Sequence, residues 1–242
     1  MVVEDKNMIS NRVIITGGTD GIGLATARLL LGKGYKVFIC GRSQNKLNNA
    51  LSDLKCFNAD LVDGVSCDVS EFMSASSMFA EAKSFMGGVD TLINNAGIGL
   101  VASLEDLSPD EWNSMIDTNL TGVFNCCKVA IDDLKKSKNA NIINLGSRAG
   151  RYAFAGGIAY CATKAGLQGF SEALFLDLSK YGIGVSLVAP GTVATGWSDV
   201  EEKNYYLHPD DVAKVIVDIL SNNFRANVNW VELRPRTKKD CT

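Results

Sequence analysis

The chain has 242 residues, of which 46% are hydrophobic and 21% are charged, and its formal net charge is -3. These values suit a globular chain and provide no basic surface for nucleic acid or for an anionic membrane. The only histidine, His208, lies in a turn-like His-Pro-Asp-Asp sequence, which excludes metal sites built from several histidines. The chain has no GxSxG sequence, which argues against a serine hydrolase.

The elements predicted from hydrophobic periodicity alternate between strand and helix along the whole chain. Such alternation implies right-handed βαβ units and a parallel sheet covered by helices on both faces. No linker divides the chain, so we expect one doubly wound α/β domain of the Rossmann type over 1–242, with seven parallel strands. In chain order the elements are a strand at Arg12–Thr16, a helix at Ile22–Lys33, a strand at Lys36–Cys40, a helix at Gln44–Leu54, a strand at Gly64–Cys67, a helix at Ser70–Met86, a strand at Thr91–Asn94, a helix at Pro109–Lys136 interrupted near Gly122, a strand at Asn141–Leu145, a helix at Tyr160–Lys180, a strand at Gly184–Val188, a helix at Pro209–Leu220 and a strand at Val228–Leu233.

The cysteines and the N-terminal segment bear on the compartment. The chain has seven cysteines, an odd number, and no CxxC pair. This pattern is typical of buried thiols in a reducing compartment rather than of a disulfide framework. Residues 1–11 contain no long apolar run, so we expect a flexible N-terminal extension without a signal peptide. No segment is apolar enough to span a membrane, and we expect a cytoplasmic protein.

A glycine-rich turn follows the first predicted strand and opens the first predicted helix. It reads Thr16-Gly-Gly-Thr-Asp-Gly-Ile-Gly23. Glycines permit close backbone approach, and the helix N-terminus presents free N–H groups to a pyrophosphate. The alternative is an ordinary glycine-rich loop, whereas a P-loop is excluded because no Lys-Ser/Thr pair follows. The expected cofactor contacts in this turn are Gly17, Thr19, Asp20, Gly21, Ile22 and Gly23.

The end of the second predicted strand bears on the choice of dinucleotide. An NAD site usually places an acidic residue about 20 residues after the turn. No Asp or Glu occurs between Gly23 and Asp53, and the strand is followed by Arg42 and Ser43. A guanidinium and a hydroxyl suit a 2′-phosphate, which favours NADP(H) over NAD(H). Asp20 would weaken this inference if its carboxylate faced that phosphate.

Tyr160 and Lys164 are four residues apart on a predicted helix, so they project from one face. Ser147 precedes Tyr160 by 13 residues and follows the fifth predicted strand, where α/β sheets bind ligands. A free tyrosine has a pKa of about 10, and a nearby ammonium is expected to lower it. Ser147 can orient a substrate oxygen on which charge develops. The alternative for the YxxxK spacing is a surface pair.

In combination, the TGxxxGxG turn, Ser147 and the Tyr160–Lys164 pair resemble the short-chain dehydrogenase/reductase family over Arg12 to about Leu233. The resemblance implies interconversion of a carbonyl and a secondary alcohol, with Tyr160 as general acid/base and Asn119 in a water relay. It also implies that Lys164 binds the nicotinamide ribose. Further cofactor contacts implied by it are Asp68 and Val69 at the adenine, Asn94 supporting the sheet, Ala96 and Gly97 beside the cofactor, and Pro190, Gly191, Val193 and Thr195 at the carboxamide.

Several residues bear on the substrate. The short segment Gly196–His208 predicts an open or small-substrate pocket, with Trp197, Tyr205 and Tyr206 as wall residues or as loop packing. Two arginines, Arg148 and Arg151, are candidates to bind an anionic substrate; the alternative is that they are structural or exposed.

Small residues form a stripe on the predicted Tyr160 helix. By the resemblance, this stripe predicts a homodimer or homotetramer, and the alternative is packing against the chain's own sheet. The stripe residues are Ala162, Ala165, Gly166, Gly169 and Ala173.

Two other functions compete with a carbonyl reductase or alcohol dehydrogenase. One is a redox sensor or scaffold that binds the dinucleotide without turnover, which has no need of the Tyr160 phenol. The other is an epimerase or dehydratase, against which the glycine spacing argues.

Overall fold

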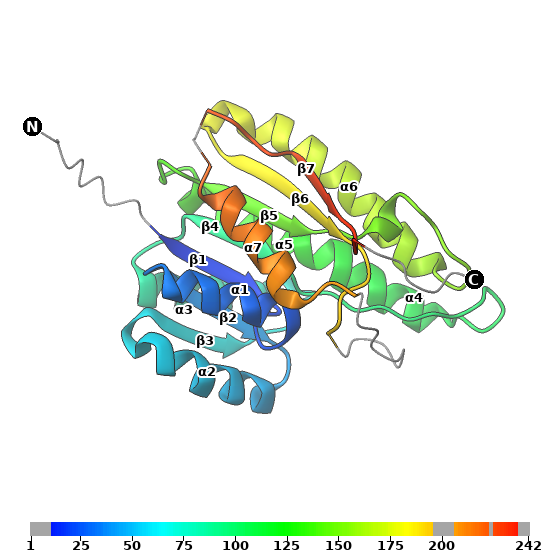
Figure 1. Ribbon diagram of the computed structural model, residues 1–242, viewed down its shortest axis with the longest axis horizontal. Coiled ribbons are helices and arrows are strands. Elements are labelled where there is room, and N and C mark those ends of the chain that lie inside the picture. The colour runs from blue at the N-terminus through cyan, green and yellow to red at the C-terminus, as the bar shows by residue number, and fades with distance from the viewer. Residues whose placement is uncertain (1–10, 196–205, 223–224, 237–242) are drawn as a thin grey trace, which may run out of the picture.

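One seven-stranded sheet organises the structure, a computed structural model that describes residues 11–195, 206–222 and 225–236. All strands are parallel, in the order β3-β2-β1-β4-β5-β6-β7, which confirms the predicted doubly wound fold (Figure 1). The strands are β1 (Arg12–Thr16), β2 (Lys36–Gly41), β3 (Val62–Ser66), β4 (Thr91–Asn94), β5 (Asn141–Leu145), β6 (Gly184–Pro190) and β7 (Trp230–Leu233).

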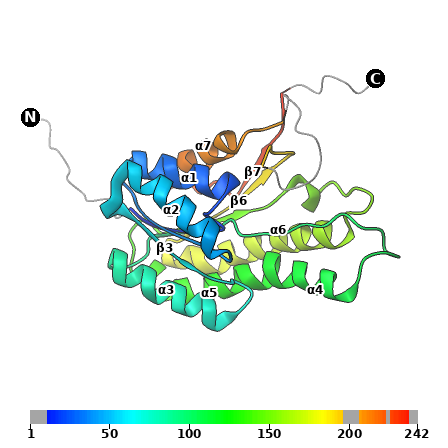
Figure 2. The same ribbon diagram turned by 90° about the horizontal axis from the view of Figure 1, so that it is seen from below.

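Helices cover both faces of this sheet, as predicted, and Figure 2 separates the two layers. In the described residues no helix is long and apolar enough to cross a membrane. One layer contains α1 (Gly21–Gly32), α2 (Gln44–Asn58) and α7 (Pro209–Leu220), and the other contains α3 (Phe72–Met86), α4 (Pro109–Ile116), α5 (Gly122–Leu134) and α6 (Ile158–Leu178). Short 3₁₀ turns lie at Ala59–Leu61, Arg148–Gly150 and Ser179–Tyr181.

The strand order reverses next to β1. The chain passes from β1 outward to β2 and β3, then returns to place β4 on the other side of β1. In open α/β sheets the crevice beyond the carboxyl ends of the strands at such a reversal is where ligands bind. The glycine turn after β1 and the segment after β4 therefore lie side by side at this crevice.

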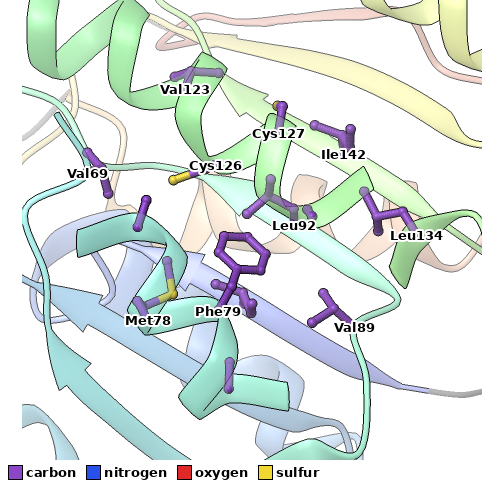
Figure 3. Close-up of a cluster of buried hydrophobic side chains, with 14 of the residues drawn as sticks. Val69, Met78, Phe79, Val89, Leu92, Val123, Cys126, Cys127, Leu134 and Ile142 are labelled. Atoms are coloured by element: carbon purple, nitrogen blue, oxygen red, sulfur yellow. The ribbon is translucent and has the colours of Figure 1, made fainter. Parts of the chain in front are cut away.

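Successive side chains of each strand point to opposite faces of the sheet and pack into two separate hydrophobic cores, as expected for strands buried on both faces. Ile14 and Leu92 pack under α3 and α5, whereas Ile15 and Ile93 pack under α1 and α7. Figure 3 shows the first core, in which Phe79 of α3 lies among side chains of β4 and α5. Burial of these apolar side chains holds the strand ends in register beside the crevice.

The predicted long helix is interrupted, but not as a simple break at Gly122. A single π-helical turn, η2 (Asp117–Thr121), joins α4 to α5. A side-chain carbon at Gly122 would lie 2.7 Å from Cγ2 of Val69, so glycine permits close approach of the helix to the loop after β3. Single π turns inside α-helices are frequent at functional sites, and this one carries Asn119.

Two predicted boundaries differ for identifiable reasons. β7 begins at Trp230 rather than Val228, because the Asn227 side chain takes the hydrogen bonds of the Val185 backbone that a longer β7 would make. Its Nδ2 donates to the Val185 carbonyl at 2.8 Å, and its Oδ1 accepts the Val185 N–H at 3.1 Å. α3 begins at Phe72 rather than Ser70, because Oδ1 of Asp68 accepts the Ser70 N–H at 3.0 Å and holds that residue in a turn. The expected extension at 1–11 lies outside the described residues except for residue 11.

Candidate active site

The glycine turn after β1 is built for close backbone approach. Gly17 has φ 63°, a conformation that favours glycine. A side-chain carbon at Gly23 would lie 2.3 Å from the Gly17 carbonyl oxygen, so α1 can start here only with glycine. Asn95 fastens the turn from the opposite side, since its Nδ2 donates to the carbonyls of Thr16 and Gly17 at 3.0 and 2.8 Å. The free N–H groups of α1 therefore face the crevice.

Asp20, inside the turn, does not present an unbalanced charge. Its Oδ1 accepts the Gly21 N–H at 2.8 Å as the cap of α1, and its Oδ2 lies 3.1 Å from Nζ of Lys46 on α2. The repulsion that the Asp20 carboxylate would exert on a 2′-phosphate is therefore offset by Lys46. Lys46 was not predicted as a site residue; its position four residues after Arg42 is a signal that sequence reasoning had available.

A cavity of about 390 Å³ opens beside this turn, at the ends of β2, β3 and β4. Its wall carries the cations of Arg42 and Lys46, and a side-chain carbon at Gly41 would lie 2.8 Å from Cγ2 of Thr19. A glycine-lined cavity with two cations fits the adenosine phosphate end of a dinucleotide. Of the predicted cofactor residues, Gly17, Thr19, Arg42, Ser43, Asp68, Val69, Ala96 and Gly97 line it; Cys40, Gly41, Lys46, Cys67, Ile98 and Thr118 line it without having been predicted.

Asn94 does not reach this cavity. Its side chain is buried and donates to Oδ1 of Asn144 on β5 at 2.8 Å, and Asn144 in turn donates to Oγ of Ser171 on α6 at 2.8 Å. This polar chain ties β4, β5 and α6 together. Asn94 therefore supports the sheet, as the sequence resemblance implied, rather than lining the cofactor cavity.

Asn119 fixes the segment after β4. Its Oδ1 accepts the Ile98 N–H at 2.8 Å, and its Nδ2 donates to the Ile98 carbonyl at 2.8 Å and to Oγ1 of Thr163 at 3.1 Å. A side-chain carbon at Gly97 would lie 3.3 Å from Oδ1 of Asn119 and 3.8 Å from Nζ of Lys164. Asn119, Gly97 and Lys164 are therefore brought together.

Tyr160 lies in the first turn of α6, and its phenol is hydrogen-bonded to the Ser147 hydroxyl that follows β5. Burial raises the pKa of Tyr160 above its ordinary value, and the hydrogen bond with Ser147 acts in the opposite direction. Ser147 is held in place because its Oγ accepts the Ala149 N–H at 3.1 Å. The structure thus brings the predicted hydroxyl and phenol together.

Lys164 lies one turn further along α6, and 7% of its surface is exposed. Its Nζ donates to the Leu145 carbonyl at 2.7 Å and lies 5.7 Å from the centre of the Tyr160 ring. Burial lowers the pKa of Lys164 to about 8. Desolvation is the largest influence on the pKa of both groups, and the Lys164 ammonium donates to a backbone carbonyl, so the expected lowering of the Tyr160 pKa by Lys164 stays a prediction.

The predicted Pro190–Thr195 segment returns to the glycine turn. Val193 pairs with Leu207, and the Ala194 N–H donates to the Leu207 carbonyl at 2.8 Å. Cγ2 of Thr195 lies 3.3 Å from where a side-chain carbon of Gly21 would stand. The segment after β6 therefore closes the crevice against α1.

Two arginines considered for substrate binding have partners at the rim of the site. Arg148 Nε lies 3.1 Å from Oε1 of Glu232 on β7 and its guanidinium lies over the Tyr152 ring, at 5.0 Å. Arg151 lies over the same ring at 5.7 Å. These contacts favour the structural alternative for Arg148. Tyr206 is half-buried, and the wall candidates Trp197 and Tyr205 lie outside the described residues.

The small-residue stripe of α6 faces outward. Ala162, Ala165, Gly166, Gly169 and Ala173 are all exposed, so the alternative of packing against the chain's own sheet is wrong. Large apolar side chains are exposed as well, among them Leu176 of α6 at 68% and Phe124 of α5 at 49%.

The family model described as short chain dehydrogenase matches residues 11–205. The chain belongs to the short-chain dehydrogenase/reductase family. It is 32% identical over 226 residues to an uncharacterised oxidoreductase of Staphylococcus aureus strain MRSA252, a match that covers 92% of this chain and 96% of that protein. The family makes this short-chain dehydrogenase an oxidoreductase that acts on CH–OH groups.

Two solved structures share the fold of this short-chain dehydrogenase closely. One is a closed form of serine dehydrogenase complexed with NADP+, with a TM-score of 0.87, 30% identity and coverage of 95% of this chain and 97% of that one. The other is an alcohol dehydrogenase of the archaeon Thermococcus sibiricus complexed with 5-hydroxy-NADP, with a TM-score of 0.86, 27% identity and coverage of 94% and 97%.

Proposed function

We propose that this short-chain dehydrogenase interconverts a carbonyl and a secondary alcohol with NADP(H), using Tyr160 as general acid/base. The observation that carries the proposal is the convergence of Ser147, Tyr160 and Lys164 at the carboxyl end of β5, with Asn119 beside them. All seven strands join one sheet, which supports a single domain for both cofactor binding and catalysis.

Each side chain has a defined part in the proposed proton transfer. Tyr160 gives a proton to the carbonyl oxygen in reduction and takes it back in oxidation. Ser147, already bonded to the phenol, orients the substrate oxygen and stabilises charge on it. Lys164 supplies a buried ammonium that would bind the nicotinamide ribose. With its ammonium turned toward that ribose, Lys164 would also lower the pKa of Tyr160. Asn119 fixes the backbone at Ile98 and supports a water relay to Lys164. A dinucleotide held by these residues would supply or accept the hydride, and its oxidised form would carry a positive charge that favours the phenolate.

NADP(H) is favoured over NAD(H) by the charges of the cavity. Arg42 and Lys46 both line it, and Asp20, the one acidic residue of the turn, is paired with Lys46. The carboxylate of Asp68, which also lines the cavity, accepts hydrogen bonds from the N–H and hydroxyl of Ser70. Two cations suit a 2′-phosphate, whereas an NAD site usually offers a carboxylate to the ribose. The NADP+ bound to serine dehydrogenase is in line with this choice.

A substrate survey tests the proposal. The purified protein is mixed with NADPH or NADH and with aldehydes, ketones, 3-oxo acyl thioesters or sugars, and the absorbance of the reduced nicotinamide is followed. We expect carbonyl-dependent oxidation of NADPH at a higher kcat/KM than that of NADH. Tight binding of NADPH without turnover on any carbonyl would favour a redox sensor or scaffold instead.

We also propose that the protein is a cytoplasmic homodimer or homotetramer. The exposed stripe on α6 supports the assembly, because small side chains allow a helix of a second copy to approach closely, and Phe124 and Leu176 would be covered there.

A further inference from the structure

Two thiols with no part in the proposed proton transfer line the dinucleotide cavity. Cys40 lies near the end of β2 and pairs in register with Val65 of β3. Cys67 directly follows β3, and its N–H donates to the Gly41 carbonyl at 3.1 Å. Because side chains alternate along a strand, Cys67 projects to the same side as Val65 and therefore as Cys40. The two sulfur atoms are neighbours, in hydrogen-bonding contact.

The two thiols have different surroundings. The sulfur of Cys67 accepts hydrogen bonds from the Cys40 thiol and from the Ser74 hydroxyl, the latter at 3.4 Å. These bonds lower the pKa of Cys67 to about 7, against the opposing effects of burial and of the Asp68 carboxylate. The same contact and full burial raise the pKa of Cys40, with Cys126 acting in the same direction. Cys67 is therefore the better nucleophile, and Cys40 holds its proton beside it.

We propose that Cys67 and Cys40 form an oxidisable dithiol in the wall of the dinucleotide cavity, which reacts with hydroperoxides. The Cys67 thiolate attacks the peroxide, so that an S–O bond forms, the O–O bond breaks, and the departing oxygen leaves as an alcohol or water after taking up a proton. The Cys40 sulfur then attacks Cys67, an S–S bond forms, and the S–O bond breaks. Water leaves with the Cys40 proton. Two thiols are oxidised and one hydroperoxide is reduced.

The disulfide and the dinucleotide exclude each other. Parallel strands lie about 4.8 Å apart and rise about 3.3 Å per residue, so residues offset by two positions have Cα atoms about 8 Å apart, whereas a disulfide requires about 4.4–6.8 Å. Closing the bond therefore draws the ends of β2 and β3 together, beside Arg42. A dinucleotide bound in this cavity would in turn lie against both residues and shield Cys67, which is only 4% exposed. This exclusion rests on the proposed position of the cofactor, whereas the thiol chemistry does not.

Three other cysteines, Cys56, Cys126 and Cys127, lack this combination. Figure 3 shows Cys126 and Cys127 of α5 packed into the core beside Leu92, and burial raises the pKa of both. Cys56 is exposed, away from the cavity, and its thiol donates to the Ser52 carbonyl at 3.3 Å. Cys56 therefore provides a matched control for reaction at an open surface.

The test is thiol mapping of the full chain by mass spectrometry after treatment with hydrogen peroxide. We expect a loss of two hydrogen atoms that dithiothreitol reverses, and a cross-linked peptide pair containing Cys40 and Cys67. The Cys40→Ser variant should stop at a sulfenic acid on Cys67 that dimedone traps, whereas Cys67→Ser should form neither product. Cys56→Ser should react like the unchanged protein. Circular dichroism checks that each variant folds. If a variant does not fold, the peptide map of the unchanged chain still shows whether Cys40 and Cys67 become cross-linked.

The cofactor arm uses NADP+ with binding confirmed by calorimetry. At an NADP+ concentration of about 100 times its Kd, the fraction of protein without bound NADP+ falls about 100-fold, and cross-linking of Cys40 and Cys67 should slow by the same factor. Oxidation at other cysteines with Cys40 and Cys67 left reduced would overturn the dithiol. Cross-linking at an unchanged rate with NADP+ bound would overturn the exclusion alone. Neither readout depends on turnover, so a failed role for Tyr160 leaves both interpretable.

Discussion

The ammonium of Lys46 lies 3.1 Å from the carboxylate of Asp20, so an ion pair joins helix α2 to the glycine turn. Both side chains are 63% exposed, and exposed pairs contribute little to stability, about 0–1 kcal/mol. The pair is therefore better explained by what it does to the cavity. It balances the only acidic residue of the turn and places a second cation near Arg42.

This arrangement predicts the effect of removing either cation. Arg42→Ala and Lys46→Ala should each weaken NADPH binding about 10- to 100-fold, since a hydrogen bond to a charged group contributes about 1.5–3 kcal/mol. NADH binding should change about threefold or less. Titration calorimetry measures both. Arg28→Ala is the control, because Arg28 pairs with Asp53 on the surface and does not line the cavity. Equal losses for NADPH and NADH would refute the cofactor preference.

The glycine turn predicts contrasting results for two glycines of α1. Gly23→Ala places a carbon 2.3 Å from the Gly17 carbonyl, so the turn must shift. We expect a loss of stability of about 1–3 kcal/mol and loss of dinucleotide binding. Gly32→Ala meets nothing within 4 Å and should stabilise by about 0.5 kcal/mol with binding unchanged. Urea denaturation and NADPH titration provide the comparison, and unimpaired binding by Gly23→Ala would contradict it.

The buried ammonium of Lys164 predicts a pH dependence of stability. Its pKa falls from 10.5 to about 8 on burial, so the unfolded chain binds more protons between these values. Stability therefore rises with pH across that window, by up to about 1.4 kcal/mol per unit, and the penalty is fully present below pH 8. The measurement is the free energy of unfolding of the unchanged chain minus that of Lys164→Met, from pH 7 to 10.5. A flat difference would show that the ammonium is not desolvated.

The exposed stripe of α6 predicts an association that charge disrupts. Ala165→Glu or Gly169→Glu should shift the protein toward monomer in sedimentation velocity, because the glutamates would be buried without partners. Asn48→Glu at an exposed position of α2 is the control and should leave the assembly unchanged. A monomeric unchanged protein would remove the prediction.

Local signals explain how much of the fold could be predicted. Helix α7 was predicted with correct bounds because Pro209 stands at its first position and Asp211 caps it, its Oδ2 accepting the His208 N–H at 2.9 Å. Strand β5 was predicted equally well from its apolar run. Such signals lie within a few residues of the boundary that they mark.

Contacts between distant segments account for what sequence reasoning missed. Asn95 was not selected, although it holds the glycine turn, because its partner at Gly17 is 78 residues away. The Asn94–Asn144–Ser171 chain depends on how α6 packs on the sheet, and so does the burial that sets the pKa of Lys164. None of these distances is encoded in spacing along the chain.

The central claim is that Tyr160 transfers the proton, and Tyr160→Phe tests it most directly. With a carbonyl found in the survey, kcat should fall by about 10²–10⁴-fold, the usual contribution of a general acid or base, while the Kd of NADP+ changes about threefold or less. Tyr181→Phe is the control, because Tyr181 lies in the 3₁₀ turn that follows α6 and is 45% exposed; this variant should keep full activity. A Tyr160→Phe variant that binds NADP+ and retains a kcat close to that of the unchanged enzyme would contradict the account.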